Sequence, residues 1–215
     1  MRVFLLGSTG RLGNEILKKL VIEKIHIHIL VRDPKKINID SQYVNIFKGY
    51  PSNYADLDKA MCNCNIIISS LNISRKTDFP WSKLRTPITL LSDTMTHLVD
   101  LASKHSIEKI ITISAWGANE SKNELPFWFK WIINNSNIKP GYIDHGKQED
   151  ILMKSNSNWT IIRPVGLNNS NRNKTPKVSI DKKPPNIMVS RKTVAKFVVD
   201  NLNNNTCNRK IVTIS

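Results

Sequence analysis

Three glycines near the start of the chain, Gly7, Gly10 and Gly13, are spaced three residues apart. A run of four apolar residues, Val3–Leu6, leads directly into the first glycine, and a segment with apolar residues at helical spacing follows the last. Glycine permits a tight turn and a close approach of backbone to a ligand, and the start of a helix offers unpaired N–H groups and a partial positive charge. This strand, turn and helix therefore predict a site for the pyrophosphate of a dinucleotide.

Two hydroxyl groups, those of Ser8 and Thr9, lie within the same turn and can add hydrogen-bond donors to it. The alternative interpretation is a glycine-rich turn that binds nothing. A glycine triplet alone is a weak signal, but a strand before it and a helix after it are the context in which such a triplet binds phosphate. The context therefore favours a ligand.

The residues at the end of the second apolar run indicate which dinucleotide would bind. An acidic residue there binds the ribose diol of NAD, whereas a basic residue binds the 2′-phosphate of NADP. The sequence places Arg32 first and Asp33 second, with Lys35 and Lys36 beyond them, and Arg11 adds a cation inside the glycine turn. A guanidinium group suits a phosphate, so the pattern favours NADP (NADPH) over NAD. The alternative is that these charges only solvate a loop.

Apolar runs alternate with segments of helical periodicity along the whole chain. The predicted strands are Val3–Leu6, Ile25–Val31, Tyr43–Phe47, Asn65–Leu71, Lys109–Ala115, Trp159–Pro164 and Lys210–Ser215. The predicted helices are Asn14–Glu23, Asn53–Met61, Leu90–Ser106, Lys147–Ser155 and Ser190–Leu202. This alternation predicts an α/β fold, a Rossmann-type doubly wound and mostly parallel sheet with helices on both faces. Asn168–Lys183, which is rich in Asn and Lys, is the best candidate for a loop.

The composition is that of a folded protein. Hydrophobic residues make up 40% and charged residues 23% of the 215 residues, a length that fits one domain. No run approaches the ~18 apolar residues of a membrane span, and the first residues do not form a signal peptide. We therefore expect a cytoplasmic protein with no membrane partner. The three cysteines have no metal-ligand spacing, so we expect free thiols and no metal.

The formal net charge of +15 allows either a nucleic acid or an anionic small molecule as a partner. The Lys and Arg residues are scattered, with only small clusters such as Arg32–Lys36 and Lys182–Lys183. No long basic block and no interleaved aromatic platform is present. A generally basic surface is therefore favoured over a nucleic-acid interface.

Four segments, GSTGRLG, LVRDP, IITISAWG and DHGKQEDILMKSNSNWTIIRP, together resemble the atypical short-chain dehydrogenases/reductases. The resemblance covers nearly the whole chain and is closest to the NmrA-like group and the flavin reductase/biliverdin IX-beta reductase group. The glycine motif is shared by many Rossmann proteins, whereas the segment ending in WTIIRP is more specific to this branch. The resemblance implies a single NAD(P)-binding Rossmann domain over residues 1–215, with a substrate pocket formed largely by residues 116–140 and 164–190.

The resemblance also implies cofactor-binding residues at the carboxyl ends of the strands. The residues implied at the pyrophosphate are Gly7, Thr9, Gly10, Arg11 and Leu12, and the residue implied at the 2′-phosphate is Arg32. Those along the adenine ribose and nicotinamide side are Leu71, Asn72 and Arg75, and those at the nicotinamide ribose are Thr112, Ser114, Ala115 and His145. Those along the carboxamide are Pro164, Val165, Gly166 and Leu167.

The chain departs from the family pattern at two places. In ordinary members a Tyr lies four residues before a Lys and donates a proton, but here those positions hold Gly141 and His145. Tyr142 is one residue out of register and would point about 100° away on a helix. A His at the corresponding position also occurs in the biliverdin/flavin reductase group. Gly49 is followed by Tyr50 where the family has an Asp that contacts adenine.

Ser114 and His145 are the candidate catalytic residues. Ser114 could donate a hydrogen bond to a developing negative charge, or it could only bind the cofactor ribose. His145 could bind the ribose or supply a proton near neutral pH, and the alternative is a surface histidine. Glu149 lies one turn after His145, at the spacing needed to orient it, whereas Asp144 is better explained as a helix cap.

Aromatic residues follow the fifth predicted strand, at Trp116 and in Pro126–Trp131. They could form a wall for a flat aromatic substrate, or an amphipathic helix that anchors a lid. Pro140 and Gly141 are expected to interrupt the helix that follows. Because family dimers often use the helices after strands four and five, this interruption favours a monomer.

Two classes of function remain open from the sequence. The first is an NADP-dependent oxidoreductase that reduces a small, flat or quinone/flavin-like acceptor by hydride transfer, without the usual Tyr–Lys pair. The second is a non-catalytic NADP-sensing regulatory protein of the NmrA-like type that binds a protein partner. Ser114 and His145 favour the enzyme, whereas the missing Tyr–Lys pair favours the sensor.

Overall fold

The fold of the chain was taken from a computed structural model, which describes residues 1–170 and 175–215. The strands are β1 (Arg2–Leu6), β2 (His26–Val31), β3 (Val44–Lys48), β4 (Ile66–Ser69), β5 (Lys109–Ile113), β6 (Trp159–Pro164), β7 (Gly166–Asn168), β8 (Val178–Ser179), β9 (Met188–Ser190) and β10 (Lys210–Ile214). The α-helices are α1 (Arg11–Ile22), α2 (Tyr54–Met61), α3 (Leu90–Lys104), α4 (Phe127–Asn134), α5 (Lys139–Lys154) and α6 (Arg191–Asp200), and two short 3₁₀ helices are η1 (Pro34–Lys36) and η2 (Asn119–Glu124).

The strands form an eight-stranded sheet in the order β3-β2-β1-β4-β5-β6-β10-β8. Every pairing in it is parallel except that of β8, which runs antiparallel to β10 at one edge. The order reverses at β1, between β4 and β2, and in a doubly wound sheet ligands bind at such a switch point, outside the carboxyl ends of the strands. The predicted Rossmann-type fold is confirmed.

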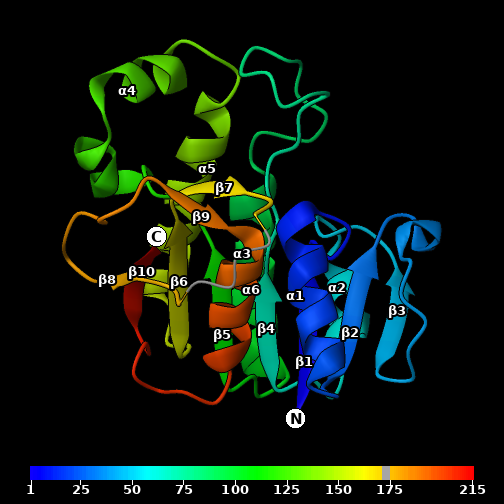
Figure 1. The fold of residues 1–215 in the computed structure, drawn as a ribbon. Coiled ribbons are helices and arrows are strands. Elements are labelled where there is room, and N and C mark those ends of the chain that lie inside the picture. The colour runs from blue at the N-terminus through cyan, green and yellow to red at the C-terminus, as the bar shows by residue number, and fades with distance from the viewer. Residues whose placement is uncertain (171–174) are drawn as a thin grey trace.

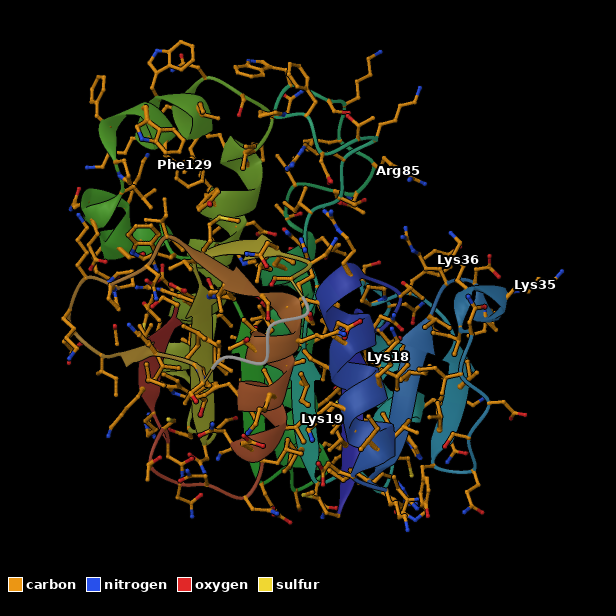
Figure 2. The ribbon with its side chains drawn as sticks, viewed as in Figure 1. Lys18, Lys19, Lys35, Lys36, Arg85 and Phe129 are labelled. Carbon is orange, nitrogen blue, oxygen red and sulfur yellow. The ribbon has the colours of Figure 1, made fainter. Side chains whose placement is uncertain are left out.

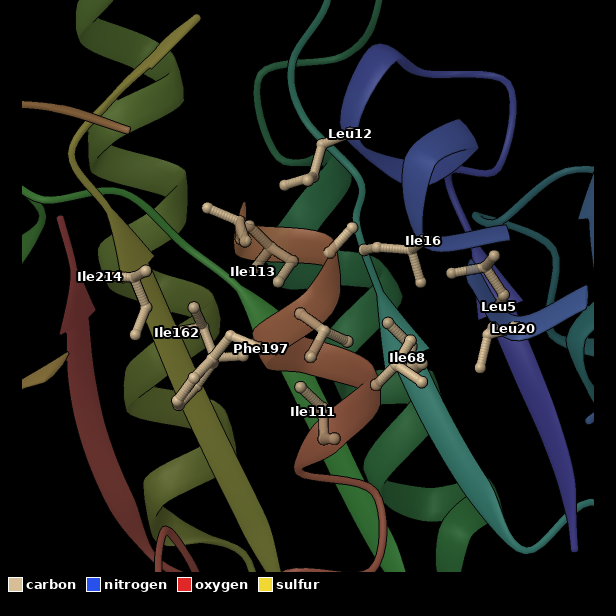
Figure 3. Packing of buried hydrophobic residues seen from close by; sticks show 14 of the residues in the cluster. Leu5, Leu12, Ile16, Leu20, Ile68, Ile111, Ile113, Ile162, Phe197 and Ile214 are labelled. Atoms are coloured by element: carbon tan, nitrogen blue, oxygen red, sulfur yellow. The ribbon is translucent and has the colours of Figure 1, made fainter. Parts of the chain in front are cut away.

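Helices cover both faces of the sheet (Figure 1). Helices α1 and α6 lie side by side on one face, whereas α2, α3 and α5 cover the other. The central strands are buried along their whole length, as their unbroken apolar runs predict for a parallel sheet. Figure 3 shows the core on the α1 and α6 face, where Leu5, Ile68 and Ile111 of the strands meet Ile16 of α1 and Phe197 of α6.

Two helix starts have side-chain caps at the first residues of the predicted helices Asn53–Met61 and Ser190–Leu202. The side chain of Asn53 accepts a hydrogen bond from the backbone N–H of Asp56 at the start of α2, and that of Ser190 accepts one from Thr193 at the start of α6. Such side chains satisfy N–H groups that have no partner within the helix. These two boundaries follow from the residue types alone.

The expected interruption of the fifth helix by Pro140 and Gly141 is wrong. Helix α5 starts at Lys139, eight residues before the predicted start at Lys147, and places Pro140 in its first turn. A proline is tolerated there because the N–H groups of the first turn have no partner within the helix. Gly141 continues the helix, so the argument for a monomer from a shortened helix loses its basis.

Some elements, among them η2, β7, β8 and β9, were not predicted from the sequence. A helix was one of the two interpretations of the aromatic run Pro126–Trp131, and α4 occupies that segment. Helix α4 and η2 stand at the carboxyl end of the sheet together with the segment between β4 and α3 (Figure 1). The predicted loop Asn168–Lys183 contains β8 and the end of β7, while its residues 171–174 lie outside the described residues. Strand β7 pairs in parallel with β9 in a separate two-stranded sheet.

Candidate functional site

The turn between β1 and α1 is built so closely that Gly7 and Gly13 cannot be replaced without strain. Gly7 has a φ of +82°, and a Cβ on Gly13 would lie 2.0 Å from the carbonyl oxygen of Gly7. At Gly10, by contrast, the contact would be 3.1 Å. The Gly10 N–H donates to the Gly7 carbonyl across 2.9 Å, which closes the turn just before the helix begins at Arg11. The turn has the close approach of helix to strand that the glycine spacing predicts.

The start of α1 offers polar groups that the fold itself does not use. Gly10 is the N-cap residue and no side chain caps the helix. The Oγ of Ser8 is buried and has no hydrogen-bond partner among the described residues, whereas Thr9 is exposed. A buried hydroxyl without a partner is costly unless a ligand satisfies it. The glycine cradle, the uncapped helix and the Ser8 hydroxyl therefore fit the phosphates of a dinucleotide.

Arg11 is engaged by a carboxylate from a distant loop. Its guanidinium donates to both oxygens of Asp78, at 2.8 and 2.7 Å, and both side chains are exposed. These hydrogen bonds lower the pKa of Asp78, and the charges of Arg75 and Arg191 lower it further. Arg191, at the start of α6, also donates to Asn169 across 2.6 Å. One carboxylate thus lies among three guanidinium groups beside the glycine turn, an environment that also suits a phosphate.

Arg32 follows the last residue of β2, at the carboxyl edge of the sheet, and its side chain is exposed. It makes no hydrogen bond or ion pair with any residue that the structure describes. Asp33, the acidic residue beside it, accepts from the backbone N–H of Lys35 across 3.1 Å and caps η1. The guanidinium is therefore available to an anion, while the neighbouring carboxylate has a structural partner.

Ser114 lies directly after β5, where its N–H continues the sheet by donating to the Ile162 carbonyl across 2.7 Å. Only 5% of the residue is exposed, and its Oγ has no hydrogen-bond partner among the described residues. The backbone therefore fixes the position of Ser114, and its hydroxyl remains free to donate to a ligand at the carboxyl edge of the sheet.

His145 is buried on α5 and is oriented by Gln148. The Nε2 of Gln148 donates to the Nδ1 of His145 across 2.8 Å and also to the Ile113 carbonyl across 3.3 Å. The Oε1 of Gln148 accepts from the Oγ1 of Thr112 across 3.3 Å. Because the amide donates to Nδ1, the proton of the neutral imidazole is on Nε2. The expectation that Glu149 orients this histidine is wrong.

Burial lowers the pKa of His145 to about 4. The imidazole is therefore neutral at pH 7. His145 is not positioned to supply a proton near neutral pH, and it is not a surface histidine. A neutral imidazole can still donate one hydrogen bond from Nε2. The structure thus leaves His145 the role of a hydrogen-bond donor.

Two carboxylates beside His145 have structural partners instead. Glu149 is fully buried and binds Arg163 at the end of β6 through two hydrogen bonds of 2.8 and 2.7 Å. Burial alone would lower the pKa of Arg163, but hydrogen bonds with Glu149 and Glu120 raise it, so the guanidinium stays charged. Asp144 lies inside α5, so it does not cap its own helix as expected, and its carboxylate instead accepts from the N–H of Leu91 across 2.7 Å at the start of α3.

The remaining predicted cofactor-binding residues differ in whether their polar groups are available to a ligand. Thr112 is fully buried and bound to Gln148, while Leu71 and Ala115 are partly buried and Asn72 is exposed. The N–H groups of Val165 and Gly166 donate to Ile214 and Ile187, each across 3.0 Å, so these two donors are not available to a carboxamide. Arg75 is partly buried, and its Nε has no hydrogen-bond partner among the described residues.

Tyr142 packs its ring edge-to-face against Phe129 of α4, with the ring centroids 6.4 Å apart. Burial raises the pKa of its hydroxyl to about 12, although the charge of Arg75 acts in the opposite direction. A tyrosine that donates or accepts a proton in catalysis needs a pKa close to the working pH. Tyr142 therefore does not replace the missing Tyr of the family.

A cavity of about 600 Å³ lies between β9, the start of α6 and the end of the chain. Its lining includes Asn168, Met188, Ser190, Thr193 and Ser215. The lining belongs largely to the second of the two segments implied for the substrate pocket, and none of it comes from residues 116–140.

Three residues of this region were missed from the sequence. Gln148 lies one helical turn after His145, so its spacing could have identified it as well as it suggested Glu149. Asp78 lies 67 residues from Arg11 and has no local signal. Arg191 directly follows a helix cap, but only the tertiary structure brings it near the glycine turn.

Comparison with known proteins gives the same class of cofactor. A protein of Bacillus subtilis (strain 168), called the uncharacterized sugar epimerase YhfK, is 27% identical over 213 residues, which cover 97% of this chain and 92% of that protein. A short-chain dehydrogenase/reductase of Veillonella parvula DSM 2008, solved in complex with NADP, is 20% identical with a TM-score of 0.78, covering 100% of this chain and 94% of that one.

The structure of ChuY, an anaerobillin reductase from Escherichia coli O157:H7, is 18% identical with a TM-score of 0.81 and covers 100% of this chain and 96% of that one. These structural likenesses support the fold. Residues 7–205 also match the sequence profile of a family described as NAD(P)H-binding. The chain therefore belongs to this NAD(P)H-binding family.

Proposed function

We propose that this protein is an NADP-dependent oxidoreductase that reduces a small, flat or quinone/flavin-like acceptor. The observation that carries the proposal is the buried and unpartnered hydroxyl of Ser114 at the carboxyl end of β5. A polar group of this kind has a cost in the fold, which a ligand that accepts its hydrogen bond would remove. Bound NADPH would supply the hydride.

The residues of the chain would then bind and orient the cofactor and stabilise the charge that develops on the acceptor. The glycine turn and the uncapped start of α1 hold the pyrophosphate, and Arg32 binds the 2′-phosphate. The hydroxyl of Ser114 donates a hydrogen bond to the negative charge that develops on the acceptor. Removal of one such donor typically costs ~3 kcal/mol in the barrier, or about a hundredfold in rate. The neutral His145 donates from Nε2 to the cofactor ribose or to the acceptor.

We further propose that the acceptor lies between residues 116–140 and 164–190. The cavity beside β9 supplies part of this space and is lined by residues of the second segment. Phe129 and Tyr142 supply aromatic surface that faces the interior of the protein. A flat acceptor suits such a lining because aromatic rings stack on one another.

The test is steady-state oxidation of NADPH with a panel of flavins and quinones. We expect turnover by the unmodified protein, a loss of about a hundredfold in Ser114→Ala and a smaller loss in His145→Ala. Tyr142→Phe is the matched control, because it removes a hydroxyl on α5 whose raised pKa makes it a poor catalytic group. The turnover rate of this variant should stay near normal. NADPH affinity measured on each variant separates loss of chemistry from loss of binding.

The missing Tyr at position 141 favours a second candidate, a non-catalytic NADP sensor that binds a protein partner. The sensor predicts NADPH binding without turnover of any acceptor in the panel. A hundredfold loss in Tyr142→Phe with normal turnover in Ser114→Ala would instead mean that the proposed role of Ser114 is wrong.

A further inference from the structure

Five large aromatic side chains are exposed at one end of the molecule. Their exposed fractions are 63% for Phe79, 43% for Trp81, 83% for Phe127, 59% for Trp128 and 54% for Trp131. Single exposed apolar residues are ordinary, but a contiguous group marks a surface that contacts something else. We call this group the aromatic surface.

Hydrogen bonds join the two segments that carry the aromatic surface. The indole N–H of Trp81 donates to the Asn135 carbonyl across 2.7 Å, directly after α4. Asn137 returns the contact, because its N–H donates to the Pro80 carbonyl across 3.0 Å and its side chain donates to the Trp81 carbonyl across 2.8 Å. The segment between β4 and α3 and helix α4 therefore form one unit, which stands at the carboxyl end of the sheet (Figure 1).

Helix α4 is more apolar than its place in the fold requires. Ile133 is buried, and Phe129, labelled in Figure 2, packs against Tyr142, so these two side chains attach the helix to the core. On the outer side, Phe127, Trp128, Trp131 and Ile132 line a shallow apolar hollow of about 420 Å³. A helix that is apolar on both sides is normally buried on both sides. The outer side therefore lacks its partner in the isolated chain.

The charge around the aromatic surface indicates the chemistry of that partner. Residues 72–89 and 122–140 contain seven Lys and Arg residues and two acidic ones. Both acidic side chains are engaged, because Asp78 binds Arg11 and Glu124 accepts from the indole of Trp116 across 2.7 Å. Lys83 and Arg85 are exposed and form no ion pair with any described residue. The partner that complements this surface is apolar and anionic.

We propose that the aromatic surface docks this protein onto an anionic lipid bilayer. Aromatic residues are favoured where membrane meets water, and Lys and Arg near them are attracted to acidic headgroups. A second copy of the chain fits less well, because it would bring the same positive charges together. None of the helices in the described part of the chain has the length and apolar character to cross a membrane, so the contact is with the surface alone.

This proposal departs from the expectation of no membrane partner, which was based on the lack of a spanning segment. It does not depend on the proposed reductase activity, since docking requires neither cofactor nor turnover. Binding to vesicles and oxidation of NADPH can therefore succeed or fail independently of each other.

The test is co-sedimentation of the full chain with vesicles of phosphatidylcholine alone and of an equimolar mixture with phosphatidylglycerol. We expect binding to the mixed vesicles only, with an affinity that falls as salt is added. The double variant Trp128→Ala/Trp131→Ala should lose roughly tenfold or more in partitioning. Ile22→Ala, at an exposed apolar residue of α1, is the matched control and should bind normally.

The charge component has its own pair of variants. Lys83→Glu/Arg85→Glu should lower binding to the mixed vesicles by roughly tenfold or more. Lys35→Glu/Lys36→Glu makes the same change in charge on η1, away from α4 in Figure 2, and should have a much smaller effect.

Three results would overturn the proposal. The first is no binding to either kind of vesicle, and the second is an equal loss in both charge variants, which would mean a nonspecific attraction of a basic protein. The third is a stable dimer in light scattering that Trp128→Ala/Trp131→Ala dissociates, because a second copy would then cover the aromatic surface. Because the native protein alone tests lipid preference and salt dependence, a variant that fails to fold does not block the test.

Discussion

The turn between β1 and α1 and the junction between β5 and α5 lie at the same edge of the sheet, but they differ in how they are built. The turn consists almost entirely of backbone, with glycines whose Cβ atoms would collide with neighbouring carbonyl groups. The junction consists of buried side chains, with Gln148 binding Thr112 and His145 while Ser114 has no partner among the described residues. Phosphate binding needs N–H groups and space, whereas hydride transfer needs donors at fixed positions.

The largest effect should come from acid at the β5–α5 junction. Unfolded His145 takes up a proton around its ordinary pKa of 6.5, but in the folded protein burial lowers that pKa to about 4. The unfolded state therefore binds more protons between these values, and the free energy of unfolding should fall by ~3 kcal/mol as the pH drops from 6.5 to 4.

Urea unfolding at about pH 7, 6, 5 and 4 measures this fall. His145→Gln should reduce the dependence, with the part due to buried His28 remaining, whereas His26→Gln, at an exposed histidine, should keep it. If the free energy of unfolding changed equally with pH in both variants, His145 would titrate equally in the folded and unfolded states. The β5–α5 junction would then not be the buried site described here.

Within the glycine turn, two positions of the same residue type should respond differently. Gly13→Ala places a methyl group 2.0 Å from the Gly7 carbonyl and should cost about 2 kcal/mol in stability, with loss of NADPH binding as the helix moves away from the strand. Gly10→Ala is the matched control for stability, since its methyl group would lie 3.1 Å from the same oxygen. Urea unfolding of both variants tests this, and equal losses of stability would contradict the close-packed turn.

The preference for NADPH over NADH should depend on the side chain of Arg32, at the edge of the site that the glycine turn forms. Arg32→Asp should weaken NADPH by about tenfold and spare NADH, because the unpaired guanidinium would otherwise bind the 2′-phosphate. Calorimetric titration of both cofactors with both proteins measures the change. Equal affinity of the unmodified protein for NADPH and NADH would show that Arg32 only solvates a loop.

The smallest effect should come from Asp78, which competes with phosphate for Arg11. Asp78→Asn should tighten NADPH binding by about threefold, because an exposed ion pair of this kind contributes little. Asp58→Asn is the matched control, since it removes an ion pair with Lys104 on the helices α2 and α3. Weaker binding in Asp78→Asn would mean that the loop carrying Asp78 helps to hold the cofactor instead.

The difference between the glycine turn, built from backbone, and the β5–α5 junction, built from side chains, also explains what could be predicted from the sequence. The glycine spacing and the apolar strands are local signals, so the first turn and the positions of the parallel strands along the chain follow from them. Asn53 and Ser190 mark helix starts for the same reason. Pro140 was interpreted as a helix breaker because the sequence alone does not distinguish the first turn of a helix from its interior.

The side-chain network at β5 and α5 could be predicted only in part. Ser114 and His145 were identified from strand ends and from the family resemblance, but whether His145 is exposed or buried depends on packing, and so does its pKa. Gln148 and Glu149 are both near His145 in sequence, and only the structure shows that the first binds His145 while the second binds Arg163.

Hydride transfer itself tests the central claim most directly. NADPH deuterated at the hydride-donating carbon is incubated with the protein and its best flavin or quinone acceptor. Loss of the label from the cofactor is followed together with the rate of NADPH oxidation, because deuterium delivered to a nitrogen or oxygen of the product exchanges with water. If the protein is a reductase, the label leaves the cofactor with a slowed rate, and Ser114→Ala lowers that rate by about a hundredfold at unchanged NADPH affinity. Tight NADPH binding with all of the label retained on the cofactor would contradict the account and identify the protein as a sensor.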